Sequence, residues 1–291
     1  MKVKPYIQLM RPANIITAIA DVLAGYAIAL HQFGSFKSNN YTLILATIGL
    51  YGGGVVLNDV FDAKLDAVER PERPIPSGMA KLKHARFLGF ALLIVGCSFA
   101  FQNHFVSGII AFYIAVLAVS YDKYAKHFSF FGPLTMGMCR GGNLLLGISA
   151  NPERINDWGF LAVISVVYIA AVTMVSRGEV NGGNSKTLYS AGVLYLFVIL
   201  GQLYVAYFSS QLFLISLTLL LIFGFLIFKP LILAINYPVG ANIAKAVKAG
   251  VISLILMDAC WCMVFGYPVL ALVTISLMPI SIYLSKSFAV T

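Results

Sequence analysis

Charged residues are scarce in this sequence. Only 11% of the 291 residues are Asp, Glu, Lys or Arg, whereas a soluble domain carries about a quarter. Apolar residues make up 60% of the chain. This balance excludes a soluble protein with an added anchor and predicts an all-α integral membrane protein embedded in the lipid bilayer.

Cysteine and histidine are also scarce, with four of each. All the cysteines fall inside apolar runs, which excludes a disulfide framework and a zinc site and predicts that they pack in the core. The histidines are scattered along the chain, so they indicate neither a metal cluster nor a catalytic dyad.

Long apolar runs, in contrast, recur from one end of the chain to the other. A helix needs about 17 to 25 apolar residues to cross the hydrocarbon layer. Runs of this length leave no room for a separate soluble domain, so we expect one membrane domain over residues 1–291. The predicted spans are 13–31, 41–58, 85–102, 105–122, 131–150, 158–176, 188–208, 211–228, 247–265 and 268–285.

The net charge of +9 comes from lysines and arginines that lie mostly on one side of these spans. If the N-terminus is inside, 17 of the 20 basic residues are inside, only Lys37 and Arg154 are outside, and Arg140 lies within a span. This bias follows the positive-inside rule. It gives no support to nucleic-acid binding, and it predicts cytoplasmic active-site loops on a protein of, we expect, a bacterial inner membrane.

One charged stretch, LNDVFDAKLDAVERPERPIPSG, follows the second predicted span. If the helix continues through it, Asp59, Asp62 and Asp66 are spaced i, i+3 and i+7 and lie on one face. Three carboxylates on one face repel each other unless a cation joins them. Mg²⁺ takes oxygen ligands and commonly pairs one or two carboxylates with substrate phosphates.

The loop after these carboxylates carries Arg70 and Arg73 between prolines that stiffen it. Guanidinium groups suit phosphate recognition. The stretch therefore favours a diphosphate and metal site at one mouth of the bundle. The alternative is a solvated loop with charged helix ends.

The segments NDVFDAKLD and RPERPIPSG resemble the N-D-x-x-D-x-x-x-D and R-P-x-R-P-[IL]-P-S-G signature of the UbiA superfamily of intramembrane prenyltransferases. LMRPANI, SYDKYAKH and CRGGNLLLG stand where such proteins carry comparable residues. The last two, with SRGEVNGGN and the terminal KSFAVT, are most similar to the branch called EboC-like. The resemblance implies a polytopic bundle of nine or ten transmembrane helices around a central cavity that opens to the cytoplasm.

The resemblance also implies a second aspartate-rich motif after the sixth span, which binds a second Mg²⁺. The matching segment, VSRGEVNGGNSKTL, has Glu179 as its only carboxylate, and Asn181 and Asn184 stand where acids are expected. Arg177 and Lys186 add positive charge that can hold phosphate directly. Three interpretations stay open: a one-metal prenyltransferase, a relative that binds or moves a polyprenyl phosphate without bond making, and other transferase or lyase chemistry.

Polar side chains within predicted spans are further candidates, because charge at membrane depth usually faces a cavity or a partner. Arg140 and Asn143 lie among glycines in the fifth span and are placed to shape a pocket or hold diphosphate. The alternative for Arg140 is a buried ion pair with Asp21 or Asp258. Asn14 either lines the same cavity or caps the first span.

Tyr121 and Lys126 follow the fourth span on the same side as the acidic stretch. A lysine there can reach a diphosphate, and the tyrosine can orient a phosphate oxygen or face an allylic cation. The alternative is an interfacial aromatic belt with lysines that extend to the membrane surface.

Together with the resemblance, these residues predict Mg²⁺-dependent transfer of an isoprenoid from a prenyl diphosphate donor to a small-molecule acceptor, with the oligomeric state open. The implied catalytic residues are Asp59, Asp62, Glu179 and Arg140, with Glu179 orienting or deprotonating the acceptor. The implied metal ligands are Asp59, Asp62 and Asp66. The implied substrate-binding residues are Asn14, Asn58, Arg70, Arg73, Tyr121, Lys126, Asn143, Arg177, Asn181 and Lys186.

Overall fold

A computed structural model describes residues 3–31, 39–179, 182–210 and 212–288, and those residues form helices and turns. Lys37 and Asn181 lie outside the described residues. The helices are α1 (Lys4–Leu9), α2 (Pro12–Leu30), α3 (Tyr41–Phe61), α4 (Ala63–Glu69), α5 (Leu82–Asn103), α6 (Phe105–Lys123), η1 (Ala125–His127), α7 (Phe131–Ile148), α8 (Arg154–Trp158), η2 (Gly159–Leu161), α9 (Ala162–Ser176), α10 (Ser185–Ser209), α11 (Phe213–Asn236), α12 (Gly240–Val264) and α13 (Pro268–Ser287).

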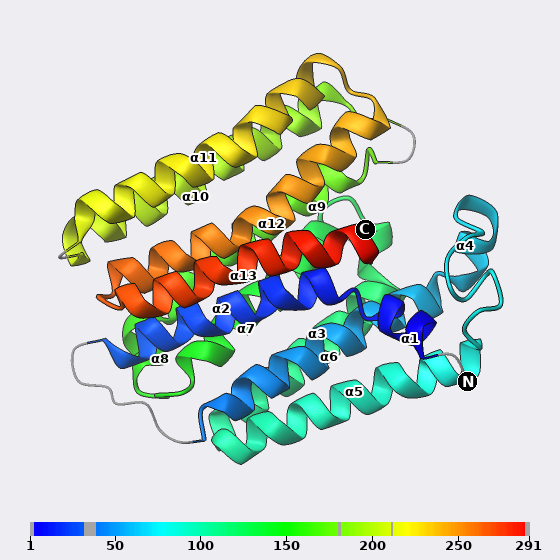
Figure 1. Ribbon diagram of the computed structural model, residues 1–291, viewed down its shortest axis with the longest axis horizontal. Helices are drawn as coiled ribbons and strands as arrows, with labels where there is room; N and C mark the ends of the chain where they lie inside the picture. The colour runs from blue at the N-terminus through cyan, green and yellow to red at the C-terminus, as the bar shows by residue number, and fades with distance from the viewer. Residues whose placement is uncertain (1–2, 32–38, 180–181, 211, 289–291) are drawn as a thin grey trace.

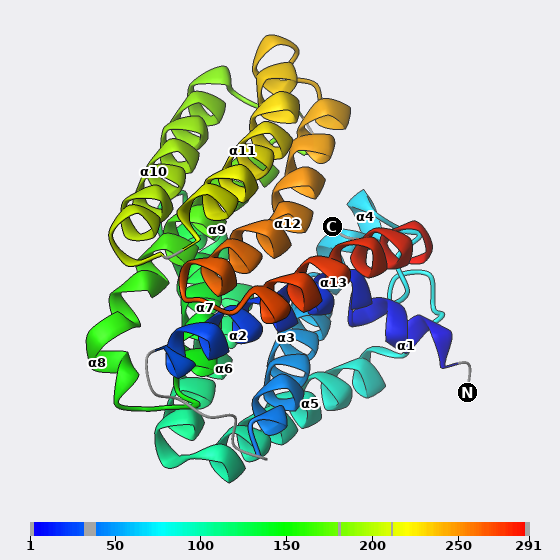
Figure 2. The ribbon, with the colours of Figure 1, turned by 60° about the vertical axis from the view of Figure 1, so that its left-hand side comes forward.

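The long helices run along one common direction, with their connections at the two ends of the bundle (Figure 1). Helix α2 lies in the middle and packs against α3, α7, α12 and α13. Helices α10 and α11 form one edge, and α5 lies at the opposite edge in both views (Figures 1 and 2). Most of α2 and α12 is buried, whereas most of α5 and α13 is not.

Nine helices within the described residues are long and apolar enough to cross a membrane, and the protein is an integral membrane protein. The tenth long helix is α7, which matches the fifth predicted span and packs against α2, α6 and α9. Arg140 and Asn143 make α7 less apolar than its neighbours. With α7 the described residues contain an even number of long helices, and an even number of crossings returns the chain to the side on which it started. Accordingly, α1 lies at the same end of the bundle as the last turns of α13 (Figure 1).

Two predicted boundaries differ from the structure by several residues. The span predicted to end at 228 continues through Pro230 to Asn236, and the span predicted from 247 begins at Gly240. A hydropathy pattern records where apolar residues stop. Backbone hydrogen bonding continues past that point because polar residues at the membrane surface are equally able to form a helix.

The acidic stretch is not one unbroken helix. Helix α3 ends at Phe61, α4 begins at Ala63, and Asp62 stands between them with φ −86° and ψ 0°. The Asp62 amide still donates to the Asn58 carbonyl at 2.9 Å, so the chain bends without losing its helical hydrogen bond. The prediction that Asp59, Asp62 and Asp66 lie on one helix face required an unbroken helix, and the structure does not have one.

Helices α2 and α7 touch backbone to backbone where Gly25 meets Gly147. A Cβ atom added at Gly147 would lie 2.6 Å from the Val22 carbonyl oxygen and 2.8 Å from the Gly25 Cα. No side chain fits at this distance. The two glycines thus allow the approach that brings the polar residues of α7 beside those of α2.

Replacing Gly147 with alanine is expected to push α2 and α7 apart. Overpacking of this kind lowers the free energy of unfolding by about 1–3 kcal/mol. Thermal unfolding of the purified protein in detergent measures the effect. Gly192→Ala in α10 is the matched control, because its Cβ would meet only side-chain atoms, the Leu231 Cδ2 at 3.4 Å and the Phe228 Cε1 at 4.0 Å. Equal midpoints for the two variants would contradict this account of the α2–α7 contact.

Candidate active site

A cavity of about 420 Å³ opens among α2, α3, α4, α6, α7, α9 and α12. Its charged and amide lining consists of Arg11, Asn14, Asn58, Asp62, Asp66, Glu69, Arg70, Arg73, Asp122, Lys126, Arg140, Asn143 and Glu179. Its apolar lining includes Leu50, Val55, Ile114, Ala118, Ile169, Val172, Val247 and Val251. The cavity thus joins a strongly charged region to an apolar one.

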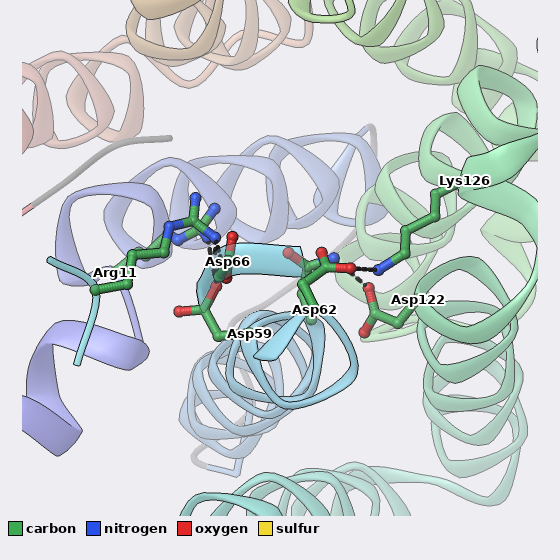
Figure 3. Close-up of polar contacts among 8 residues, drawn as sticks. Arg11, Asp59, Asp62, Asp66, Asp122 and Lys126 are labelled. Carbon is green, nitrogen blue, oxygen red and sulfur yellow. Dashed lines mark hydrogen bonds and ion pairs between the residues drawn. The ribbon is translucent and has the colours of Figure 1, made fainter. Parts of the chain in front are cut away.

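Asp59 and Asp66 are joined by arginines on one side of the α3–α4 bend (Figure 3). Arg11 Nη2 donates to Asp59 Oδ1 at 2.8 Å. Arg73 Nη1 reaches both carboxylates, at 3.2 Å from Asp59 Oδ1 and 2.9 Å from Asp66 Oδ2. Both aspartates are buried, and Asp59 is not part of the cavity lining.

Asp62 points the other way, toward the end of α6 (Figure 3). Lys126 Nζ donates to Asp62 Oδ1 at 2.5 Å. Asn58, one helical turn before Asp62, donates to Asp122 Oδ1 at 2.9 Å. The four side chains therefore form a second polar group between α3 and α6, separate from the arginine-linked one.

The carboxylates of the cavity offer the hard oxygen donors that Mg²⁺ prefers. Asp62, Asp66, Asp122 and Glu179 all line it. Within the described residues, no group of three or more His, Cys, Asp or Glu side chains is arranged to hold a metal by itself. The buried Asp122 Oδ2 has no hydrogen-bond partner there. This donor set fits a metal that takes one or two carboxylates and completes its shell with phosphate and water.

Arg140 both forms a buried ion pair and lines the cavity. Its Nε lies 2.6 Å from Asp21 Oδ2, so it forms a buried ion pair with α2, and its side chain also lines the cavity. Asn143 donates to the same Asp21 oxygen at 2.8 Å and accepts from Thr47 Oγ1 at 2.6 Å. Asp258, the other candidate partner of Arg140, is fully buried beside this cluster.

The segment that matches the second motif contributes little to the cavity. Glu179 lines it, but the exposed Arg177 donates instead to the carbonyl oxygens of Lys126 and Phe128. Lys186 is exposed and absent from the cavity lining. Asn184 accepts from the Lys186 amide at 2.9 Å and so caps α10. The predicted pair of basic residues is not brought to the cavity.

The remaining predicted residues do reach it. Asn14, Arg70 and Tyr121 line the cavity. Asn14 lies inside α2 and does not cap that helix, because the N-cap position belongs to Arg11.

Arg11 and Asp122 were not among the predicted site residues. Arg11 has a left-handed backbone with φ 48°, rare for a residue other than glycine, and this turn precedes Pro12 and aims the guanidinium at Asp59. Asp122 is an acid in the last turn of an apolar helix, and its position beside Tyr121 is the sequence signal that could have identified it.

A sequence model of the UbiA prenyltransferase family matches residues 18–247, more than half of the chain. The digeranylgeranylglyceryl phosphate synthase of Methanosarcina barkeri is 31% identical over 158 residues, which cover 50% of this chain and 55% of that protein. The synthase of the same name from Methanosarcina mazei is 30% identical over 189 residues, 61% and 64% of the two chains. The chain thus spans 55% and 64% of the length of these two relatives, less than two thirds of either.

Solved structures share the fold. A UbiA homolog from Aeropyrum pernix K1 aligns with a TM-score of 0.70 at 15% identity, covering 84% of this chain and 96% of that one. A UbiA homolog from Archaeoglobus fulgidus, bound to GPP and Mg²⁺, aligns with a TM-score of 0.64 at 12% identity, covering 84% and 99%. The central cavity therefore lies in a UbiA-like bundle.

Arg140 is expected to matter for stability apart from any role with a ligand. Arg140→Gln leaves Asp21 and Asp258 buried without their cation, and loss of one partner from a buried ion pair lowers the free energy of unfolding by about 3–5 kcal/mol. Arg154→Gln breaks the Arg154–Asp157 pair, whose Asp157 side chain is 55% exposed. That change is expected to stay within about 1 kcal/mol. Thermal unfolding in detergent compares them, and similar losses would contradict the assignment.

Proposed function

The chain belongs to the UbiA prenyltransferase family, and we propose that it transfers an isoprenoid group from a prenyl diphosphate to a small-molecule acceptor within the membrane. One observation carries the proposal: the cavity joins a charged region to an apolar one. A prenyl diphosphate has the same division, with a dianionic or trianionic head and a hydrocarbon tail. The names of the archaeal relatives, which describe a prenylated glyceryl phosphate product, support a lipid-like acceptor.

The diphosphate is held, in this proposal, by the cations of the cavity. Arg70, Arg73 and Lys126 line it from the loop after α4 and from η1. Arg11, the N-cap residue of α2, lines the same region. Fixed cations in a site that excludes water stabilise the negative charge that develops on a departing diphosphate.

Mg²⁺ is part of the proposal, supported by the Archaeoglobus fulgidus homolog bound to GPP and Mg²⁺ and by the oxygen donors of the cavity. When bound, the ion supplies positive charge to the diphosphate oxygens. Asp62 lines the cavity at the α3–α4 bend and is the principal ligand in this proposal. Asp66 and Asp59 stand behind it and share Arg73, so their part as ligands requires that arginine to turn toward the diphosphate.

The other residues of the cavity receive roles that follow from their positions. Tyr121 lies beside Asp122 at the end of α6 and lines the cavity, and in this proposal it orients a phosphate oxygen or faces the allylic cation. Glu179 reaches the cavity from beyond α9 and orients or deprotonates the acceptor. Arg140 and Asn143, held on Asp21, form the polar inner wall. Ile169, Val172 and Val247 exclude water from the tail.

A second candidate function rests on the same site. Glu179 is the only carboxylate of the segment that matches the second motif, and Arg177 there bonds to backbone carbonyls. A protein that binds a polyprenyl phosphate without bond making needs the cations and the apolar tunnel but not the acids. We also propose that the chain belongs to the EboC-like branch, on the similarity of SYDKYAKH, CRGGNLLLG and SRGEVNGGN to that branch.

The proposed orientation puts the charged end of the cavity in the cytoplasm. Seventeen of the 20 lysines and arginines support it through the positive-inside rule. The relatives named above come from archaea, so the host membrane, predicted from the sequence to be a bacterial inner membrane, stays a prediction.

Diphosphate release tests the reaction. Purified protein incubated with Mg²⁺ and a panel of prenyl diphosphates is expected to release diphosphate. Asp62→Ala is expected to lower that release at least about a hundredfold, since it removes the principal ligand of the Mg²⁺ that offsets the charge on the leaving group. Asp157→Ala, on the exposed α8 pair, is the control with normal release. Tight binding of a prenyl diphosphate by the unaltered protein with no release from any of the panel would favour the carrier function.

Topology is tested with alkaline phosphatase, which is active only outside the cytoplasm. In a bacterial host, we expect an inactive fusion after Glu69, which follows two spans, and an active one after Asn151, which follows five. A fusion to the C-terminus is expected to be inactive, because ten crossings return the chain to its starting side. An active C-terminal fusion would mean that α7 does not cross the membrane.

A further inference from the structure

Asp122 differs in its partners from the three aspartates around the α3–α4 bend. Asp59, Asp62 and Asp66 each accept from an arginine or a lysine within 3.2 Å. Asp122 forms no ion pair within the described residues, and its one hydrogen bond comes from the neutral Asn58 amide. Its Oδ2 atom is buried without a hydrogen-bond partner there, although the residue lines the cavity and is only 4% exposed.

A buried carboxylate oxygen without a donor is costly, and proteins resolve the cost with a proton or with a cation. Lys126 is the nearest basic side chain of this group, but its Nζ is committed to Asp62. Asn58 occupies the other Asp122 oxygen. The open position at Oδ2 therefore suits a cation that enters the cavity.

Asp62 and Asp122 are neighbours, although they come from different helices. Asn58 contacts Asp122, Lys126 contacts Asp62, and Asn58 and Asp62 are one helical turn apart on α3. Figure 3 shows Asp122 facing Asp62, with Lys126 reaching Asp62 from η1, just after α6. Two carboxylates with one lysine between them carry a net negative charge, which is the charge pattern of a divalent cation site rather than of an anion site.

We propose that Asp122 is a metal ligand, paired with Asp62, for the Mg²⁺ that accompanies the diphosphate head. Diphosphate and water oxygens complete the shell, in keeping with the preference of Mg²⁺ for one or two carboxylates plus substrate phosphates. The segment after α9 has Glu179 as its only carboxylate. In this proposal the second carboxylate for the metal comes instead from α6, as Asp122. This inference rests on the proposed function, because it assumes a Mg²⁺–diphosphate complex in this cavity.

Metal binding, measured without turnover, tests the inference. Purified protein is titrated with Mn²⁺ in the presence of methylenediphosphonate, a diphosphate that is not cleaved, and free Mn²⁺ is followed by its paramagnetic resonance signal. Asp122→Asn keeps the shape and the hydrogen bond with Asn58 but removes the charge. We expect it to raise the Mn²⁺ dissociation constant at least about tenfold, the scale seen when groups around a metal are removed. Asp157→Asn is the matched control with unchanged affinity.

Two further variants separate the outcomes. Asp122→Glu keeps the carboxylate and is expected to bind Mn²⁺ more tightly than Asp122→Asn, which also provides a test if the asparagine variant folds poorly. Asp62→Asn is expected to lose affinity with Asp122→Asn. If only Asp62→Asn loses affinity, Asp122 is a protonated structural side chain and the inference is overturned while the proposed function stands. If neither variant loses affinity, the metal part of the proposed function fails as well.

Discussion

A charge inside this helical bundle must lie close to an opposite charge, and most of the site follows from that requirement. An unpaired charge in a medium of low polarity is several kcal/mol less stable than a paired one. Arg140 of α7 lies on Asp21 of α2, Arg11 before α2 lies on Asp59 of α3, and Lys126 of η1 lies on Asp62. Each pair joins two segments that are distant in sequence, so the pairs hold the walls of the cavity in register.

The same pairs determine how a ligand can enter. Three of the cations that suit a diphosphate, Arg11, Arg73 and Lys126, are already bonded to Asp59, Asp62 and Asp66. A diphosphate alone would have to displace these carboxylates and leave them without a cation. A diphosphate that arrived with a divalent ion would leave no group unpaired. The diphosphate would take the place of the carboxylates beside the arginines and the lysine, and the divalent ion would take the place of those basic side chains beside the carboxylates. The charge balance of the site therefore favours a metal–diphosphate complex over either ion alone.

The acidic groups are gathered on one side of the cavity. Helices α3, α4 and α6 carry Asp62, Asp66 and Asp122, whereas the segment after α9 brings only Glu179 to the lining. Arg177, on that poorer side, turns to the backbone of the loop before α7. Gly132 of α7 makes this turn possible, since a Cβ there would lie 2.8 Å from Arg177 Nη2. The site is thus asymmetric, with its aspartates concentrated near the α3–α4 bend and the end of α6.

The class of fold, the ten long helices, the family resemblance and most of the charged and amide residues of the cavity could be predicted from the sequence, because hydropathy, charge bias and short motifs are local properties of the chain. A pair between Arg140 and Asp21 or Asp258 was the alternative to a role in the cavity, since a charge within a span needs a partner. Only the tertiary structure decided which carboxylates work together. The bend at Asp62 separates Asp59 and Asp66 from Asp62, and the packing of α6 against α3 brings Asp122 to Asp62. The direction in which each side chain points depends on that bend and that packing, and neither is encoded in the spacing of residues along a single helix.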